Sequence, residues 1–138
     1  IVVRNTRTGA VLEQMVLPAL EMGGYFVERQ VRLTERLGGG RHYGDIVASK
    51  NDERIVISLK WQQSSGTAEQ KVPYEFMCLA DVLAKDSTIH KAYIVIGGNG
   101  WTKHQFFLND LNDWVNTNEF VDVVRLDHFV AKANQGRL

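Results

Sequence analysis

Residues 44–48 read GDIVA and residues 54–62 read RIVISLKWQ, with the polar tetrapeptide KNDE (50–53) between them. Both runs are short and rich in β-branched residues, which predicts two strands joined by a tight turn. Strand side chains alternate between the two faces of a sheet. The segment is therefore predicted to form a β-hairpin in which Asp45, near the start of one strand, approaches Lys60, near the end of the other.

The second strand of this hairpin has one mainly polar and one apolar face. The polar face carries Val56, Ser58, Lys60 and Gln62, and the apolar face carries Ile55, Ile57, Leu59 and Trp61. A lysine at the inner end of a buried strand needs an anionic partner, and Asp45 would supply one. A carboxylate and an amine that converge there can hold a divalent cation and orient a water molecule. That combination suits the hydrolysis of a phosphodiester.

The same reading of periodicity extends outward from the hairpin. It predicts helices over 9–22, from near 68 to 85 and over 102–117, strands over 25–33, 92–96 and 121–126, and a short closing helix. Thr8 and Thr102 are the expected helix caps, and Pro73 suits the first turn of a restarted helix. In the helix over 102–117, the residues expected to face the core are Phe107, Leu111, Trp114 and Val115.

The element order is helix, three strands, helix, strand, helix, strand. Helices on both faces of a central mixed β-sheet bury all the apolar faces that this order offers, so we predict an α/β fold. The chain has 138 residues, of which 44% are hydrophobic and 23% charged. This size and composition predict one domain over residues 1–138.

Charge and cysteine content narrow the class of protein. The formal net charge is zero, so affinity for nucleic acid must come from a local patch or from a second subunit. Cys78 is the one cysteine, which excludes a disulfide framework and argues against a cysteine-based zinc site. The sequence has no run long and apolar enough to span a membrane and no signal peptide, so we expect a reducing, cytoplasmic setting.

The element order and the hairpin residues resemble the PD-(D/E)-x-K nuclease superfamily, which has the restriction-endonuclease-like fold, and its type II restriction enzymes in particular. The superfamily pattern is an acid on one strand, followed by acid-x-lysine on the next. Asp45 matches the first acid and Lys60 the lysine. Ser58 stands where the second acid is usual, and Gly44 where proline is common. The segment 60–67 is also similar to strands of bacterial restriction-type nucleases.

The resemblance implies Mg²⁺, or Mn²⁺ in its place, held by Asp45 and the Leu59 carbonyl. Some members with serine at the second position take the missing acid from the following helix, where Glu75 is the candidate and Glu69 the reserve. Glu13 lies on the first helix, where many members place a glutamate near the metal. The simpler alternative is that Glu13 and the later acids are solvated helix residues.

The resemblance also implies roles for the remaining polar residues. Lys60 would orient the attacking water and help to deprotonate it, with Ser58 and Gln62 as polar support. Gln62 is equally well read as an ordinary polar strand end. DNA contacts are expected from Arg41 and Tyr43 in the glycine-rich loop, from Gln63 and Ser64 in the next loop, and from Lys103. His42 could act as a general base, although lone histidines are more often surface or core residues.

The function that we expect is a metal-dependent endodeoxyribonuclease, the catalytic domain or subunit of a restriction-type enzyme. It would cut double-stranded DNA to leave 5′-phosphate and 3′-hydroxyl ends. It would act as a homodimer, or as a heterodimer with a specificity subunit. The alternative is a non-catalytic DNA-binding or assembly subunit with a degenerate site, which Ser58 motivates. A third alternative is an interaction domain that binds neither DNA nor metal.

Overall fold

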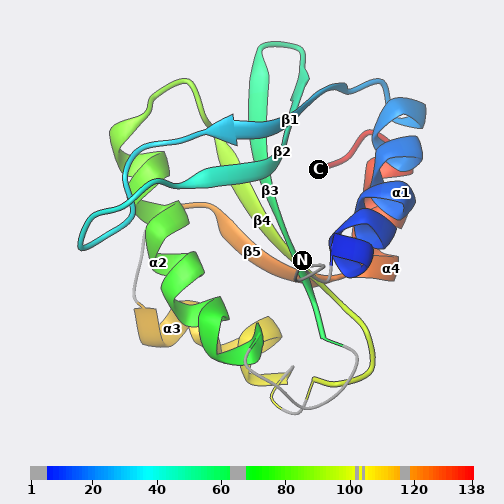
Figure 1. Ribbon diagram of the computed structural model, residues 1–138. Coiled ribbons are helices and arrows are strands. Elements are labelled where there is room, and N and C mark those ends of the chain that lie inside the picture. The colour runs from blue at the N-terminus through cyan, green and yellow to red at the C-terminus, as the bar shows by residue number, and fades with distance from the viewer. Residues whose placement is uncertain (1–5, 63–67, 102, 104, 116–118) are drawn as a thin grey trace.

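The computed structural model describes residues 6–62, 68–101, 103, 105–115 and 119–138 (Figure 1). The elements are α1 (Thr6–Met22), β1 (Phe26–Arg32), β2 (Tyr43–Lys50), β3 (Glu53–Trp61), α2 (Ala68–Lys85), β4 (Lys91–Gly97), the π-helical η1 (Phe106–Asp110), α3 (Leu111–Val115), β5 (Val121–Arg125) and α4 (Leu126–Asn134).

The strands form one five-stranded mixed sheet in the order β1-β2-β3-β4-β5. β2 is antiparallel to both β1 and β3, whereas β4 is parallel to both β3 and β5. The predicted hairpin is present. Its turn residues Asn51 and Asp52 have φ of 51° and 66°, which is the backbone that a twisted two-residue hairpin turn requires.

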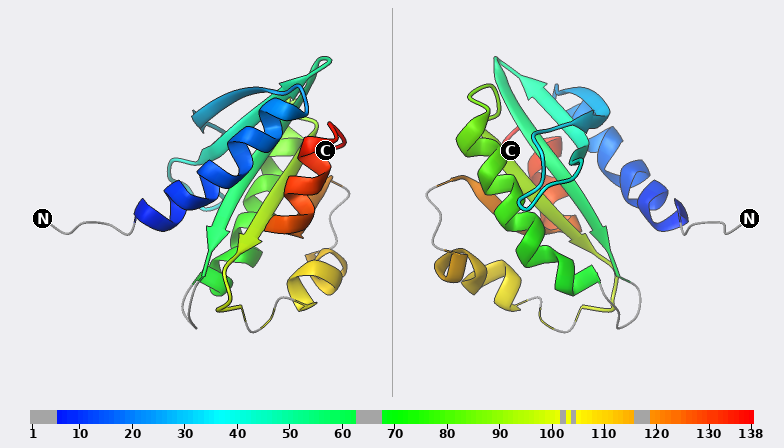
Figure 2. Two further views of the ribbon diagram at one scale, coloured as in Figure 1. Left: turned by 90° about the vertical axis from the view of Figure 1, so that its right-hand side faces the viewer. Right: turned by 60° about the vertical axis from the view of Figure 1, so that its left-hand side comes forward.

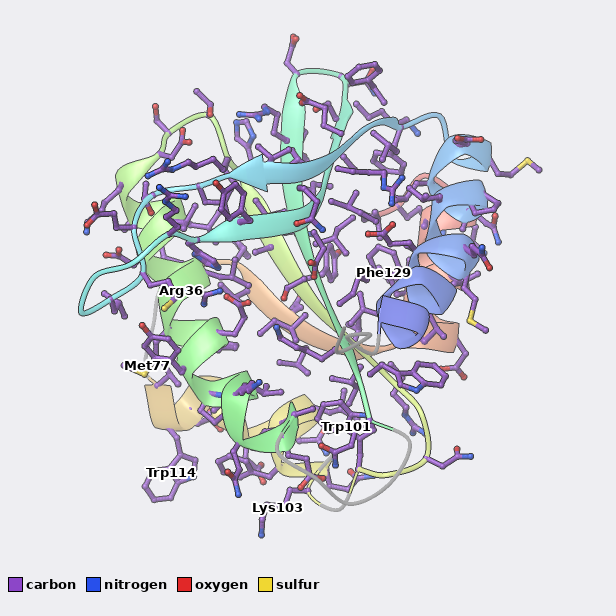
Figure 3. All side chains as sticks on the ribbon, viewed as in Figure 1. Arg36, Met77, Trp101, Lys103, Trp114 and Phe129 are labelled. Atoms are coloured by element: carbon purple, nitrogen blue, oxygen red, sulfur yellow. The ribbon has the colours of Figure 1, made fainter. Side chains whose placement is uncertain are left out.

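Helices cover both faces of the sheet, which confirms the predicted fold class. Figure 2 shows α1 and α4 on one face and α2 on the other. The alternation of β3 produces this division, because Ile55 and Ile57 join the core under α1 and α4, and Val56 joins the core under α2. Phe129 of α4 is fully buried in the α1/α4 core (Figure 3).

Strand β4, which lies between β3 and β5, is buried along nearly its whole length, as expected for a parallel strand covered on both faces. Cys78 is also fully buried, in the packed face of α2.

Four local predictions were wrong. Thr8 lies inside α1 rather than at its start, and α2 continues through Pro73 without restarting. The third helix begins later than predicted and opens with a π-helical turn, and Thr102, its expected cap, lies outside the described residues. Trp114, which was expected to be inside, is 78% exposed and points away from the protein (Figure 3). Phe107 and Leu111 are buried and Val115 packs against the α2-side core, so of the four residues predicted to face inward only Trp114 does not.

The edge strand β1 is kinked at one residue. Gln30 has φ of 51°, and the ladder with β2 has pairs at Arg29–Ile46 and Val31–Gly44 but none between them. The register places Gln30 opposite Asp45 of β2.

None of the helices in the described part of the chain is both long enough and apolar enough to cross a membrane.

Candidate active site

Asp45 lies at the point where β2 separates from β3. The β2–β3 ladder extends only to the Ile46–Ile57 pair, whereas β2 continues to pair with β1 as far as Tyr43. Asp45 Oδ2 accepts a hydrogen bond from the Leu59 N–H at 2.7 Å. The carboxylate therefore takes the place of a ladder partner, and the strands can separate without leaving a backbone donor unpaired.

Asp45, Ser58 and Lys60 lie on the sheet face that α2 covers. Val47 lies on the same face of β2 as Asp45, and Val56 on the same face of β3 as Ser58 and Lys60. Both valines belong to the α2-side core, and Glu75 of α2 contacts both Ser58 and Lys60. The structure thus brings Asp45 and Lys60 to one face, as the hairpin pattern predicts. The chemical roles that we assign to them stay predictions.

Glu75 is the centre of a buried polar cluster and is only 5% exposed. Its Oε2 accepts a hydrogen bond from Ser58 Oγ at 3.1 Å and lies 3.4 Å from Lys60 Nζ. Its Oε1 lies 2.6 Å from His42 Nε2 and 3.8 Å from Arg36 Nη1. The helix carboxylate therefore lies directly beside the serine that replaces the second acid of the pattern.

The cations around Glu75 keep this carboxylate ionised. Burial alone would raise its pKa. The hydrogen bond from His42 and the charges of Lys60, His42 and Arg36 outweigh burial and lower the pKa to about 2.

Asp45 has the opposite shift, because burial raises its pKa above the ordinary value. The Leu59 N–H and Lys60 act against this rise, while the charges of Glu75 and Glu13 add to it. Asp45 is thus within electrostatic range of three of the predicted site residues, of which Glu75 and Glu13 belong to helices on opposite faces of the sheet.

Two of the other predicted acids have partners of their own. Glu13 forms an ion pair with Arg29 of β1. Glu69, the reserve for Glu75, accepts a hydrogen bond from the Lys103 N–H at 3.1 Å, so it anchors the loop before η1.

Gln62 links the end of β3 to two other segments. Its Nε2 donates to the Gly100 carbonyl at 2.7 Å, and its Oε1 accepts from the Glu69 N–H at 3.1 Å. Gly98 lies so close that an added Cβ would be 2.4 Å from the Gln62 carbonyl oxygen. These contacts fix the loop after β4 against β3, and the support of catalysis predicted for Gln62 stays a prediction.

The candidate DNA contacts are distributed around α2. Arg41 and Tyr43 are exposed where β2 begins. Lys103 lies near the start of α2 and points into solvent (Figure 3). Gln63 and Ser64 lie outside the described residues.

The superfamily pattern places Glu75 near Ser58 and Lys60, but the sequence does not indicate its other two partners, His42 and Arg36. Of the two interpretations of His42, general base or surface or core residue, the structure shows a buried position. The pairing of His42 and Arg36 with Glu75 joins positions 33 or more residues apart, so no local periodicity points to it. His42 is 1% exposed, and its Nδ1 has no hydrogen-bond partner within the part of the chain that the structure describes.

We expect the His42→Ala variant to lower the free energy of unfolding by about 2–4 kcal/mol, because it opens a cavity and removes the shortest bond to the Glu75 carboxylate. Urea unfolding at neutral pH measures this loss. His128→Ala is the matched control, since His128 is exposed and should change stability by less than about 0.5 kcal/mol. Equal effects of the two substitutions would show that the His42–Glu75 bond does not stabilise the fold.

Comparison with known proteins identifies the class. A family model described as PD-(D/E)XK nuclease superfamily domain matches residues 4–137, so the chain belongs to the PD-(D/E)XK nuclease superfamily. No curated protein matches the chain in a sequence comparison.

Two solved structures share the fold. One is AF1548, a protein of unknown function, with TM-score 0.55, 14% identity and coverage of 86% of this chain and 59% of the other. The other is an fdxN element excision controlling factor protein from Anabaena variabilis, with TM-score 0.57, 16% identity and coverage of 87% and 94%. The chain thus spans less than two thirds of the first structure and nearly all of the second.

Members of this superfamily typically use divalent metals. The oxygen donors at the point where β2 and β3 separate are of the type that binds such an ion. Asp45 offers its second oxygen, and the Leu59 carbonyl is adjacent in the chain to Lys60. The charges of Glu75 and Glu13 both raise the pKa of Asp45, which indicates a repulsion that a cation would relieve. Among the described residues, no group of three or more acidic, histidine or cysteine side chains is arranged as a metal cage. Mg²⁺ needs no such cage, because it commonly uses one or two carboxylates together with water and phosphate oxygens.

Proposed function

We propose that this domain is a metal-dependent endodeoxyribonuclease that hydrolyses phosphodiester bonds of double-stranded DNA. The observation that carries the proposal is the convergence of Asp45, Lys60 and Glu75 where β2 and β3 separate, with Lys60 Nζ 3.4 Å from Glu75 Oε2. Superfamily membership supports the same chemistry.

In the proposed mechanism, Lys60 orients the attacking water and assists its deprotonation. Glu75 holds the ammonium in position, and Ser58 fixes the Glu75 carboxylate by donating to the same oxygen. The Lys60 charge also stabilises negative charge that develops on the phosphate oxygens in the transition state.

Mg²⁺ or Mn²⁺ would be held by Asp45 and the Leu59 carbonyl, with Glu75 and Glu13 as nearby acids. When bound, the ion would supply Lewis-acid stabilisation of the phosphate and help to generate the nucleophile. The hydrogen bond from the Leu59 N–H keeps the Asp45 carboxylate oriented where β2 and β3 separate.

Incubation of supercoiled plasmid with the protein and Mg²⁺ or Mn²⁺ tests this proposal. We expect nicked and linear products with 5′-phosphate and 3′-hydroxyl ends, and none when EDTA replaces the metal. Cleavage that continues at the same rate in EDTA would exclude a metal-dependent nuclease.

A non-catalytic DNA-binding or assembly subunit is the second candidate. Ser58 replaces a carboxylate, and both Glu75 oxygens already have protein partners, which favours a structural role for this acid. Such a subunit would bind the plasmid in a gel-shift assay but leave it uncut, alone and with its natural partner.

We propose that recognition of a DNA sequence depends on a second subunit, either another copy of this chain or a specificity subunit. The zero net charge supports this, because the isolated chain lacks the overall positive charge of a typical nucleic-acid binder.

A further inference from the structure

A groove lies at the carboxyl ends of the three parallel strands. Its largest cavity measures about 490 Å³ and is lined chiefly by Trp61, Gly98, Asn99, Arg125 and Asp127. Arg125 also lines two adjoining cavities of about 210 and 300 Å³, the first beside Trp101 and the second beside His128. We call the three together the carboxyl-end groove, and Arg125 is the residue common to all of them.

The register of the sheet aligns Arg125 with Lys60. Lys60 pairs with Ile96 of β4, and Ile96 pairs with Arg125 of β5. All three belong to positions that face α2, since Ile96 and Val123 are in the α2-side core. Two strand spacings separate the backbones of Lys60 and Arg125 by about 10 Å. Lys60 is not among the residues that line the three cavities, but the next residue, Trp61, lines the largest one. A ligand in the groove therefore extends from Arg125 to the end of β3, next to Lys60.

The local structure does not explain an arginine at position 125. The side chain is exposed and forms no hydrogen bond or ion pair with any other described residue. Arg125 is the N-cap of α4 and makes no capping bond, although Ser, Thr, Asp or Asn would cap the helix better. A cation at a helix N-terminus is also opposed by the helix dipole. Asp127, in contrast, suits the first turn of α4 and needs no other explanation.

We propose that the carboxyl-end groove binds the sugar-phosphate backbone of the strand being cut, and that Arg125 holds a phosphate near the scissile one. The planar guanidinium can donate two hydrogen bonds to one phosphate. The Trp61 ring and the Asn99 amide offer a stacking surface and a polar contact to the adjoining nucleotide. The identification of the ligand as DNA depends on the proposed nuclease function. The groove itself is inferred from its cavities and from Arg125, which is unpaired among the described residues.

The Arg125→Asn variant tests the groove, because it should change stability and DNA binding in opposite directions. Asparagine is a better N-cap, so we expect the melting temperature to rise by about 2–4 °C. At the same time DNA affinity should fall about five- to tenfold. The slope of log Kd against log salt concentration should decrease by about 1, because one phosphate contact is lost. The probes are a fluorescein-labelled DNA duplex and the corresponding single strand, measured by anisotropy in EDTA so that cleavage plays no part.

Arg137→Asn is the matched control. Arg137 is also exposed, and it follows Gly136, which lies against Lys50 at the hairpin end of the sheet. Weaker binding of either probe by Arg125→Asn but not by Arg137→Asn supports the groove, and the affected probe shows which form of DNA it takes. Equal affinities of the two variants, or no binding of either probe by the wild-type chain, overturn it. A wild-type chain that binds through Arg125 but never cuts plasmid would retain the groove and refute the nuclease function.

Discussion

Replacement of Lys60 by alanine should slow DNA cleavage by about 10²- to 10⁴-fold, the usual size of a lost proton-transfer or orienting group. The Lys60 ammonium contacts Glu75, and its charge also acts on Asp45. Its side chain is 23% exposed, and Glu75 keeps His42, Arg36 and Ser58 as partners. The fold should therefore persist, and single-turnover cleavage with matched circular dichroism measures the effect.

Lys85→Ala is the control for charge, because Lys85 lies at the far end of α2 and pairs only with Asp81 among the described residues. Asp45→Asn is the companion variant. It preserves an oxygen for the Leu59 N–H but removes the negative charge, so cleavage should also fall while stability does not. Wild-type cleavage rates in Lys60→Ala would remove Lys60 from the mechanism.

The Glu75→Gln variant should remove most of the acid sensitivity of the fold. The pKa of Glu75 is lowered from 4.5 to about 2 in the folded protein. A lowered folded pKa gives stability that is fully present above the unfolded value, near 4.5, and is lost as the pH falls toward 2. The shift corresponds to about 3 kcal/mol, since one pKa unit is about 1.4 kcal/mol.

Urea unfolding at a series of pH values from neutral to about 2 measures this contribution. At neutral pH, Glu75→Gln should be about 3–5 kcal/mol less stable, because Lys60 and Arg36 lose their buried counter-charge. The difference should shrink as the pH falls, because protonation of Glu75 in the wild-type chain removes the same charge. Glu21→Gln, an exposed change on α1, should leave the wild-type pH dependence intact. Parallel curves for wild type and Glu75→Gln would contradict the ionised state of Glu75.

The fold was predictable wherever one local period dominates. The alternation in β3 correctly separated its two faces, and the helical stripe gave the bounds of α2. The position of Glu75 near Ser58 followed from the missing acid of the superfamily pattern. The partners His42 and Arg36 could not be predicted, because a tertiary contact alone joins their loop to α2. The bonds of Gln62 were missed for the same reason, since Gly100 lies 38 residues further along the chain.

The kink at Gln30 has a consequence for self-association. A long, regular edge strand presents free backbone donors and acceptors to which another chain can add. In β1 the left-handed backbone of Gln30 interrupts this template midway, and Glu28, Arg29 and Arg32 place charges along it. The opposite edge, β5, is only five residues long. Both borders of the sheet are thus poor seeds for intermolecular β-sheet, which protects the molecule against aggregation.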